Sequence, residues 1–370
     1  MAKARYIMIG GFLGSGKSTS ILKLGHYLKR QGVTVGLITN DQAAGLVDTA
    51  LLASQGFSVE EIAGGCFCCR FNSLVDAADR LSKETRPDVF IAEPVGSCTD
   101  LVASVSYPLR RMYADNFTVA PLSVLVDPVR AMRVLNLESG KAFSSKVIYI
   151  YRKQLEEADL IVINKSDLLD RASLDRLKDA LKSQFPRAEV LECSARHETG
   201  LDPWFQQITV HEQNKKDTME LDYDIYADGE ALLGWLNCTV EVSAREPIEG
   251  DFLLKTLATD LQQRLNSAGM EIAHLKVTLS PNDQSGELAV INLVRNDYVP
   301  ELSQSLSDPL QQGQLILNLR AEASPELLYT SVNEALNHCC AQIPNLSLTM
   351  EHLEKFRPAK PTPTYRMATV

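Results

Sequence analysis

A glycine-rich segment near the N-terminus constrains the fold of this 370-residue chain more than any other feature. Residues 11–18 read GFLGSGKS and match the pattern G-x-x-x-x-G-K-[ST], in which backbone N–H groups point at phosphate oxygens. An apolar run at 5–9 precedes the segment, and a helical pattern follows it to residue 29, so the helix would begin at the phosphate. The sequence therefore predicts a strand, a phosphate-binding loop and a helix in succession.

The individual residues of this loop are assigned separate roles. In this motif the lysine side chain reaches the β- and γ-phosphates, and the serine hydroxyl binds Mg²⁺. We therefore predict a catalytic role for Lys17 and a magnesium contact for Ser18. The residues predicted to bind the nucleotide phosphates are Gly11, Gly14, Ser15, Gly16, Lys17, Ser18 and Thr19.

Short apolar runs alternate with helical patterns through the first half of the chain. The runs at 34–39, 89–92, 123–126 and 160–163 are almost wholly apolar, which is typical of strands buried on both faces of a parallel sheet. Repeated strand–helix units imply an α/β fold with right-handed crossovers. We therefore predict a nucleotide-binding domain, with a mainly parallel sheet flanked by helices, over residues 1–208.

The rest of the chain is predicted to form a second, smaller domain. Alternating and helical patterns follow one another after a polar segment, which indicates an α+β domain with helices on one face of a small sheet. The proline-rich C-terminal segment is predicted to be extended or disordered. The predicted boundaries are 209–225 for the linker, 226–345 for the α+β C-terminal domain and 346–370 for the tail.

The tetrapeptide N-K-S-D, directly after one of the apolar runs, predicts recognition of guanine. The Asp167 carboxylate would accept hydrogen bonds from the ring N–H and the exocyclic amine of guanine, a pair of donors that adenine lacks. Asn164 would hold the loop and the base edge, and the Lys165 stem would cover a ring face. Ser194 and Ala195 follow a later strand pattern and are candidates for a backbone contact to the guanine oxygen. The alternative is an ordinary helix N-cap, for which Asn and Asp are common.

The apolar run at 89–92 ends in Glu93-Pro-Val-Gly96, an acid followed by a glycine three residues later. The carboxylate is placed to hold Mg²⁺ through water, as a Walker-B acid does. The N–H of Gly96 would contact the γ-phosphate and move when that phosphate leaves. Asp41 follows the run at 34–39 and would face Mg²⁺ or the attacking water, although turn chemistry explains it equally well. We predict catalytic roles for Glu93 and Asp41.

Three thiols lie within four residues at Cys66-Phe-Cys68-Cys69. Thiolates are soft ligands that suit Zn²⁺ and similar transition-metal ions, and three of them leave a position open for another donor or for transfer. The alternatives are buried unreactive cysteines or a closed structural zinc site. Cys98, two residues beyond Gly96, is either a further thiolate ligand when the switch moves or a small buried residue.

Charge and hydrophobicity restrict the location and the partners of the chain. The 37 Lys and Arg residues against 47 Asp and Glu residues give a net charge of −10, which disfavours nucleic-acid binding because such binding needs a cationic surface. No apolar stretch approaches the roughly 20 residues that span a bilayer, and none forms a signal-peptide core. We therefore expect a cytoplasmic protein that binds neither nucleic acid nor membrane, with its eight cysteines as thiols or metal ligands rather than disulfides.

Together these motifs resemble the CobW/HypB/UreG family of P-loop GTPases, and most closely its CobW-like branch. The resemblance lies in GGFLGSGKST at 10–19, GGCFCC at 64–69, EPVG at 93–96 and QLEEADLIVINKSDL at 154–168, and it covers about residues 5–208. It implies slow hydrolysis of GTP to GDP and phosphate, coupled to the binding of a metal and its delivery, often to a zinc, cobalt or nickel enzyme.

Two features depart from the CobW-like pattern. Residues 40–45 read NDQAAG where such proteins commonly carry N-[ED]-F-G-E, and the chain has no histidine-rich tract. The second domain, which opens with YADGEALLGWLN at 226–237, does not match the usual CobW C-terminal domain. These departures suggest a distinct branch with a different client, for which a corrinoid protein is one option.

Two functions remain open from the sequence. In the first, the chain is a GTP-hydrolysing metallochaperone that binds Zn²⁺ or Co²⁺ at the clustered cysteines and uses GTP and Mg²⁺ to control delivery to a client metalloprotein or cofactor enzyme. In the second, it is a GTP-switched assembly or reactivation factor for a cofactor enzyme, corrinoid enzymes included, and its metal site is structural. A small-molecule kinase is a third option, against which the guanine-reading segment argues. A homodimer is also left open.

Overall fold

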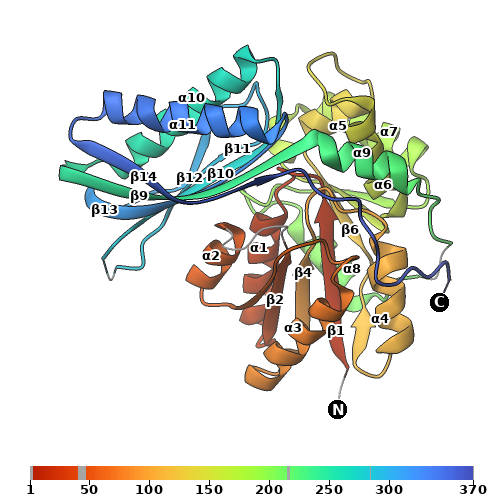
Figure 1. Cartoon of the computed structure of the whole chain (residues 1–370). Helices are drawn as coiled ribbons and strands as arrows, with labels where there is room; N and C mark the ends of the chain where they lie inside the picture. The colour runs from red at the N-terminus through yellow and green to blue at the C-terminus, as the bar shows by residue number, and fades with distance from the viewer. Residues whose placement is uncertain (1–2, 41–46, 215–216, 284, 370) are drawn as a thin grey trace. The chain divides into compact units, whose positions relative to one another are not determined.

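The computed structural model of the chain describes residues 3–40, 47–214, 217–283 and 285–369. The chain divides into two compact units, each assembled from separate segments (Figure 1). Unit 1 comprises Met1–Ala44, Gln55–Gly229 and Lys360–Val370. Unit 2 comprises Gly45–Ser54 and Glu230–Ala359. Both units therefore differ from the continuous ranges expected from the sequence, because each recruits a short segment that lies far away along the chain.

Unit 1 is built on a parallel sheet in the order β3-β2-β4-β1-β6-β7-β8, with β5 paired to β1. The strands are β1 Ala4–Gly11, β2 Val35–Asn40, β3 Ser58–Ile62, β4 Val89–Glu93, β5 Phe117–Val119, β6 Ser123–Val126, β7 Leu160–Ile163 and β8 Glu189–Glu192. Helices flank this sheet (Figure 1). The predicted α/β class is confirmed, and so are the strands expected from continuous apolar runs, because those strands are buried along their whole length.

The helices of unit 1 bury one face each. In α7, for example, Leu174, Leu177 and Leu181 recur at helical spacing and are the buried residues of the helix. Asp170 caps this helix, because its side chain accepts a hydrogen bond from the N–H of Ser173. The α-helices are α1 Lys17–Arg30, α3 Phe71–Glu84, α4 Tyr107–Met112, α5 Pro128–Val134, α6 Ser145–Glu157, α7 Arg171–Gln184 and α8 Leu201–Val210, with most of α9 Tyr223–Leu232.

The parallel topology gathers the conspicuous motifs at one edge of the sheet. The phosphate loop follows β1, Glu93 ends β4 and Asn40 ends β2. The cysteine loop follows β3, and the N-K-S-D segment follows β7. Because the carboxyl ends of parallel strands meet at the same edge, segments more than 100 residues apart in sequence line a common region.

Unit 2 is an α+β unit, as predicted. Its six-stranded antiparallel sheet has the order β12-β11-β10-β13-β9-β14, and the two long helices α10 and α11 pack on the sheet and on each other. Leucines from both helices and from the inward face of the strands form its core. The strands are β9 Leu233–Ile248, β10 Glu271–Pro281, β11 Ala289–Leu293, β12 Glu301–Gln304, β13 Leu310–Glu322 and β14 Leu346–Phe356, and the helices are α2 Val47–Ser54, α10 Gly250–Ser267 and α11 Pro325–Gln342.

The prediction of an extended or disordered tail over residues 346–370 is wrong for its first half. Residues 346–356 form β14, which pairs antiparallel with β9 from Leu346↔Ala244 to Phe356↔Trp235. The polar residues that suggested a tail lie on the exposed side of this strand, as expected for an edge strand. The predicted linker at 209–225 also contains regular structure, because α8 ends at Val210 and α9, Tyr223–Leu232, begins within it.

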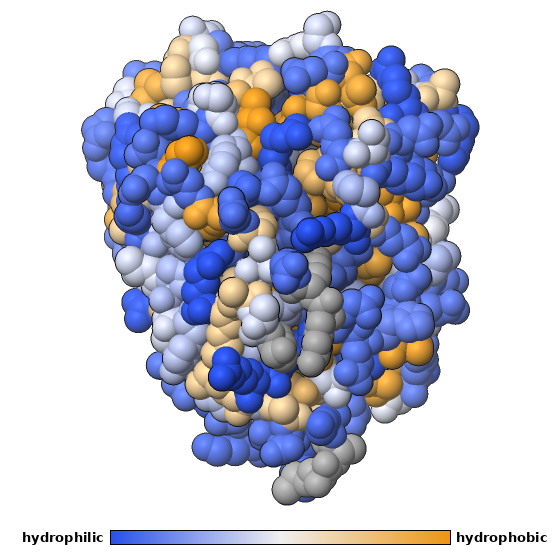
Figure 2. Space-filling model, turned by 90° about the vertical axis from the view of Figure 1, so that its right-hand side faces the viewer, coloured by the Kyte–Doolittle hydropathy of each residue, from blue (hydrophilic) through white to orange (hydrophobic). Residues whose placement is uncertain are grey.

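The face of the molecule drawn in Figure 2 is mainly polar. Figure 2 shows one face, on which hydrophilic residues predominate and hydrophobic residues form small separate groups. The exposed large hydrophobic side chains in the described parts of the chain are Met112, Val210, Ile225, Phe252 and Val299. Within those same parts, no helix has both the length and the apolar character that crossing a bilayer requires.

Candidate functional site

The phosphate loop between β1 and α1 has the backbone geometry that its glycines predict. Gly16 has φ 91°, a left-handed conformation, and a Cβ atom at this position would lie 2.4 Å from Nδ2 of Asn164. Glycine is therefore required here both for the backbone conformation and for the close approach of the neighbouring loop. Ser15 and Lys17 are buried, whereas Thr19 is exposed on the first turn of α1.

The predicted base-reading loop is fastened directly to the phosphate loop. The amide nitrogen of Asn164 donates to the carbonyl of Ser15 at 2.9 Å, and Nζ of Lys165 donates to the carbonyl of Gly14 at 2.7 Å. Lys165 Nζ also lies 3.0 Å from Oδ2 of Asp127, a residue at the end of β6 that the sequence analysis did not select. Predicted phosphate and base segments thus form one continuous hydrogen-bonded surface.

The other predicted base contacts lie on the same side of the sheet. The N–H of Ala195 donates to Oδ1 of Asn164 at 3.0 Å, so this amide orients the asparagine side chain. Ser194 is buried and bridges to Thr199. Asp167 is exposed, and one of its carboxylate oxygens lies 3.7 Å from Nε2 of His197. The Asp167 carboxylate is therefore accessible to a base, and its contact with guanine stays a prediction.

The residues predicted to bind Mg²⁺ contact each other. The hydroxyl of Ser18 donates to Oε1 of Glu93 at 3.0 Å, and Nζ of Lys17 lies 3.8 Å from the same oxygen. A hydroxyl and a carboxylate are the hard oxygen donors that Mg²⁺ prefers, and a lysine beside them suits phosphate oxygens. The residues present therefore fit a magnesium nucleotide. Asp41, the remaining predicted catalytic residue, lies outside the described residues.

The loop after Glu93 is braced by α6. Nε2 of Gln154 donates to the carbonyls of both Gly96 and Cys98, each at 2.9 Å. One turn further along the same helix, the two oxygens of Glu157 accept hydrogen bonds from the hydroxyl of Thr99 and from the N–H of Val102. We refer to residues 93–102 as the switch loop. Gln154 and Glu157 were not predicted to act here, although both belong to the stretch that precedes the N-K-S-D segment.

The three clustered cysteines form one sulfur site between β3 and α3. The Sγ atoms of Cys66 and Cys68 are 2.7 Å apart, those of Cys66 and Cys69 3.3 Å, and those of Cys68 and Cys69 3.7 Å. A tight turn brings them together, because the N–H groups of Cys69 and Arg70 both donate to the carbonyl of Cys66. Among the described residues, these three are the group whose ligand atoms all lie within 4.8 Å.

The cysteine loop is tied to the end of the neighbouring strand. The side-chain amide of Asn40, the last residue of β2, donates to the carbonyls of Ile62 and Gly65 at 2.9 and 2.7 Å. Gly65 has φ 145°, and Gly64 before it has φ 78°, so the glycines allow the bend that the sequence suggested. Asn40 thus links the sulfur site to the sheet edge that carries Glu93.

A C-terminal segment covers the sulfur site. Residues 360–367, which we call the C-terminal strap, belong to unit 1 and run along the cysteine loop. The N–H of Thr364 donates to the carbonyl of Cys68 at 2.8 Å, and its hydroxyl donates to the carbonyl of Cys69 at 3.0 Å. The ring of Tyr365 packs edge-on against Phe71, the first residue of α3. Cys66 and Cys68 are 6% and 1% exposed, and Cys69 is half-buried beneath the strap.

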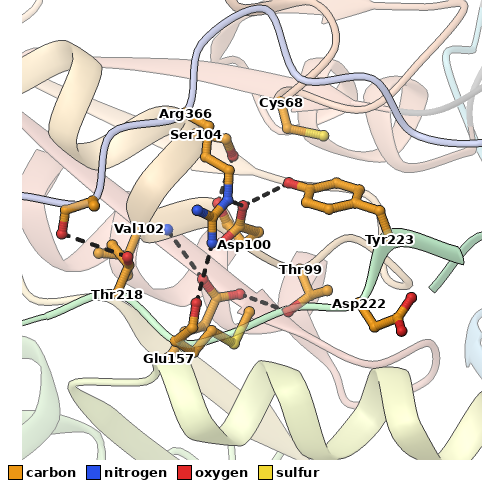
Figure 3. Close-up of polar contacts among 12 residues, drawn as sticks. Cys68, Thr99, Asp100, Val102, Ser104, Glu157, Thr218, Asp222, Tyr223 and Arg366 are labelled. Carbon is orange, nitrogen blue, oxygen red and sulfur yellow. Dashed lines mark hydrogen bonds and ion pairs between the residues drawn. The ribbon is translucent and has the colours of Figure 1, made fainter. Parts of the chain in front are cut away.

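The strap also holds the switch loop through a buried carboxylate (Figure 3). Nε of Arg366 lies 2.8 Å from Oδ2 of Asp100, and the hydroxyl of Tyr223 donates to the same oxygen at 2.6 Å. Burial raises the pKa of Asp100, and the hydrogen bonds from Tyr223 and Arg366 with the charge of Arg366 oppose that effect. The strap therefore contacts both the sulfur site and the switch loop.

Two thiols of the sulfur site, those of Cys68 and Cys69, have a raised pKa because of contacts with neighbouring thiols. Hydrogen bonding with Cys66, then with Cys69 and Cys98, together with burial, raises the pKa of the Cys68 thiol well above its ordinary value. The pKa of Cys69 is raised as well, mainly by its contact with Cys66. A metal ion that binds the sulfurs of Cys68 and Cys69 must therefore displace protons from them.

Comparison with known proteins places the first half of the chain in a described domain. The sequence profile described as CobW/HypB/UreG, nucleotide-binding domain, matches residues 5–192. This range contains the phosphate loop, the sulfur site, the switch loop and the base-reading loop.

Individual relatives each match a little under half of the chain. The zinc chaperone CobW of a Sinorhizobium species is 30% identical over 201 residues, which are 49% of this chain and 56% of that protein. The zinc chaperone YeiR of Escherichia coli K12 is 32% identical over 164 residues, 43% of this chain and 46% of that protein. The chain thus matches about half of the length of these relatives. The structure of the hydrogenase maturation factor HypB from Archaeoglobus fulgidus covers 55% of this chain and 87% of its own, at 22% identity and a TM-score of 0.38.

Proposed function

The chain belongs to the CobW/HypB/UreG family, and from that premise we propose that it is a GTP-hydrolysing metallochaperone. It would bind a transition-metal ion at Cys66, Cys68 and Cys69 and deliver the ion, or a metal cofactor, to a client protein. Two relatives that each match a little under half of the chain are named zinc chaperones, which supports this proposal and favours zinc as the cargo. Cobalt remains the second candidate.

One structural relationship carries the proposal. The sulfur site follows β3 and Glu93 ends β4, and only β2 lies between these strands: in register, Thr39 of β2 pairs with Glu93 of β4, and Asn40 pairs with Ile62 of β3. Asn40 then holds the carbonyl of Gly65, one residue before the first cysteine. A displacement of the β4 end that accompanies loss of the γ-phosphate would therefore reach the cysteine loop through two neighbouring strand ends.

The residues of the nucleotide site have distinct roles in this proposal. Lys17 would leave Glu93 for the β- and γ-phosphates, and Asp167 would select guanine. Ser18 and Glu93 would hold Mg²⁺, which neutralises the charge of the phosphate oxygens during transfer to water. Gly96 would sense the γ-phosphate through its N–H. The bound nucleotide would thereby control how firmly the switch loop is held.

The partners follow from the same proposal. GTP is the substrate, and the client is a metalloprotein or a cofactor enzyme, with corrinoid enzymes among the candidates. We propose a cytoplasmic site of action, where thiols stay reduced and available to metals. The proposal does not require a homodimer, and the oligomeric state is to be measured.

The coupling between the two sites is the decisive test. Zinc affinity of anaerobically purified protein would be measured by competition with a chromophoric chelator, with a non-hydrolysable GTP analogue, with GDP and without nucleotide. We expect the affinities with the GTP analogue and GDP to differ by at least about five-fold, the low end of ordinary coupling free energies. Equal affinities in all three conditions would remove the metallochaperone cycle from consideration.

The burial of Cys66 and Cys68 favours a second candidate function. A closed sulfur site would suit a structural metal in a GTP-switched assembly or reactivation factor for a cofactor enzyme. In that case Cys66→Ser would lower the thermal stability of the chain but leave GTP-dependent binding of its partner intact. In the metallochaperone, the same substitution would weaken zinc binding and abolish delivery while the nucleotide affinity stays unchanged.

A further inference from the structure

We propose that Cys98 of the switch loop is a fourth sulfur ligand, which joins Cys66, Cys68 and Cys69 on the metal ion in one nucleotide state and leaves it in the other. This inference rests on the proposed metallochaperone function and adds to it the residue that connects the nucleotide to the metal. On ligation, the Cys98 thiol would lose its proton to solvent and form a metal–sulfur bond.

The position of the Cys98 sulfur is the first argument. Its Sγ atom lies 4.0 Å from Sγ of Cys68. In a tetrahedral zinc site the zinc–sulfur bonds are about 2.3 Å, so that two sulfurs on one ion lie roughly 3.8 Å apart. The distances from Cys68 to Cys69, 3.7 Å, and from Cys68 to Cys98, 4.0 Å, both lie near this value. Cys98 is nevertheless outside the group of three whose ligand atoms all lie within 4.8 Å of one another.

The backbone attachment of Cys98 is the second argument. Gln154 holds the carbonyls of Gly96 and Cys98 with a single amide nitrogen, and the N–H of Cys98 donates to the carbonyl of Val95 at 2.9 Å. Gly96 in turn packs on the phosphate loop, because a Cβ atom there would lie 3.0 Å from the backbone nitrogen of Leu13. A shift of Gly96 towards or away from the γ-phosphate would therefore move Cys98 as well.

Packing alone does not explain this cysteine. Cys98 and Cys238 are both 2% exposed, and a buried cysteine ordinarily acts as a small apolar residue, as Cys238 does in the core of unit 2. Cys98 differs because its sulfur points at a thiol of the sulfur site and its backbone belongs to the switch loop. A serine or an alanine is small enough to fit at this position but would not place a soft donor there.

The number of sulfur ligands has a functional consequence. Four thiolates close the coordination of zinc, as in structural sites, whereas three leave a position open for an incoming ligand. A chain that alternates between four and three sulfurs would hold the ion in one nucleotide state and offer it to a client thiolate or imidazole in the other. This alternation would give the coupling between metal and nucleotide a defined chemical basis.

X-ray absorption at the zinc edge tests the inference on the full-length protein. The chain would be loaded with one equivalent of zinc and measured with a non-hydrolysable GTP analogue and with GDP. We expect four sulfur neighbours with one nucleotide and three with the other, and three with both in Cys98→Ser. Three sulfurs in both states of the natural sequence would overturn the ligand assignment, and four in both would overturn its control by nucleotide.

Affinity measurements separate this inference from the proposed function. In Cys98→Ser we expect zinc affinity to fall by at least about 10-fold in the nucleotide state that has four sulfur ligands, because loss of even a residue that only supports a metal ligand lowers metal affinity by that much. We also expect the zinc affinity of this variant to be the same with the GTP analogue and with GDP. Cys238→Ser is the matched control, because it makes the same change at an equally buried site in unit 2. If Cys98→Ser kept the full nucleotide dependence, Cys98 would be excluded while the metallochaperone function stood.

Discussion

The backbone N–H of Thr362 donates a hydrogen bond to Sγ of Cys69 at 3.3 Å, although the two residues are 293 positions apart. Cys69 is the member of the sulfur site that is half-buried rather than buried. The C-terminal strap therefore covers the most accessible of the three thiols. N–H···S contacts of this kind commonly orient the sulfur ligands of metal sites.

Removal of the strap is expected to expose Cys69. A chain that stops after Ala359 loses the contacts of Thr362 and Thr364 with the cysteine loop. Loss of a hydrogen bond worth about 1 kcal/mol makes the conformation in which Cys69 is accessible to solvent roughly five-fold more populated. We therefore expect alkylation of Cys69 to be at least about five-fold faster than in the full-length protein. The rate would be measured by mass spectrometry with iodoacetamide on metal-free protein.

Two further variants identify the cause of this change. Cys69→Ser in the truncated chain should remove the fast-reacting thiol, since Cys66 and Cys68 are buried. Arg366→Glu should produce the same acceleration without truncation, because it places a carboxylate against the buried Asp100. An unchanged alkylation rate in both strap variants would mean that the strap does not control access to the site.

Much of the fold of unit 1 follows from the sequence because its central strands are buried on both faces. The apolar runs that form β4, β6 and β7 were located almost to the residue. β3 reads SVEEI, and most of its residues are part-exposed. Its two glutamates interrupt the apolar pattern by which a buried strand is recognised in a sequence. β14 was missed for a similar reason, since one face of this edge strand is polar. The inclusion of α2 in unit 2 depends on contacts with β10 and β13, which local patterns do not encode.

The candidate site divides in the same way. The phosphate loop, the base-reading loop and the cysteine loop are contiguous motifs, so their residues could be selected from spacing and chemistry. Asn40, Gln154 and the strap act through partners 25, 58 and 293 residues away, and only the folded chain brings those partners together. The sequence gives little sign that Asp127 contacts the base-reading loop, because an Asp before Pro at a strand end is typical of a helix N-cap.

Selection of guanine is expected to depend on the carboxylate of Asp167. In Asp167→Asn an amide N–H replaces one acceptor oxygen, and the loss of hydrogen bonds to a charged group, about 1.5–3 kcal/mol, predicts a fall in GTP affinity of roughly 10- to 150-fold. Xanthosine triphosphate carries a carbonyl in place of the guanine amine, so its affinity should rise. Both would be measured by competition with a fluorescent nucleotide.

Asp179→Asn provides the control for this substitution. Asp179 is exposed on α7, so neutralising it changes the net charge equally without touching the base-reading loop. GTP affinity in this variant should match that of the natural sequence. If Asp167→Asn also kept its GTP affinity and gained none for the xanthine nucleotide, the N-K-S-D segment would be a helix cap rather than a base reader.

Gly96→Ala is expected to uncouple GTP binding from hydrolysis. The added Cβ would lie 2.8 Å from the side chain of Leu13 and 3.0 Å from its backbone nitrogen, so the switch loop must move away from the phosphate loop. Loss of one N–H contact to a charged phosphate predicts a fall in the hydrolysis rate of about 10-fold or more. Phosphate release would be measured at saturating GTP, together with GTP and GDP affinities.

The control for Gly96→Ala is another crowded glycine. At Gly36, in the first half of β2, an added Cβ would lie 2.8 Å from Pro87, so Gly36→Ala causes comparable overpacking far from the phosphate loop. Both variants should lose about 1–3 kcal/mol of stability, but only Gly96→Ala should lose hydrolysis. Equal hydrolysis rates in the two variants would argue against a sensing role for Gly96.

The C-terminal boundary of unit 2 can be tested with two stop positions. A chain that ends after Ala359 keeps β14, whereas one that ends after Asn345 removes it and leaves the long strand β9 as an unpaired edge. The second truncation also removes buried Leu346 and the stacking of Phe356 on Trp235.

Because removing a single buried leucine side chain costs about 2–5 kcal/mol, we expect the stop after Asn345 to destabilise unit 2 by at least about 2 kcal/mol and to promote association through the open edge. Thermal unfolding and light scattering on the two truncated chains would measure both effects. Equal unfolding temperatures would mean that unit 2 is complete without β14, as the predicted boundary at residue 345 implied.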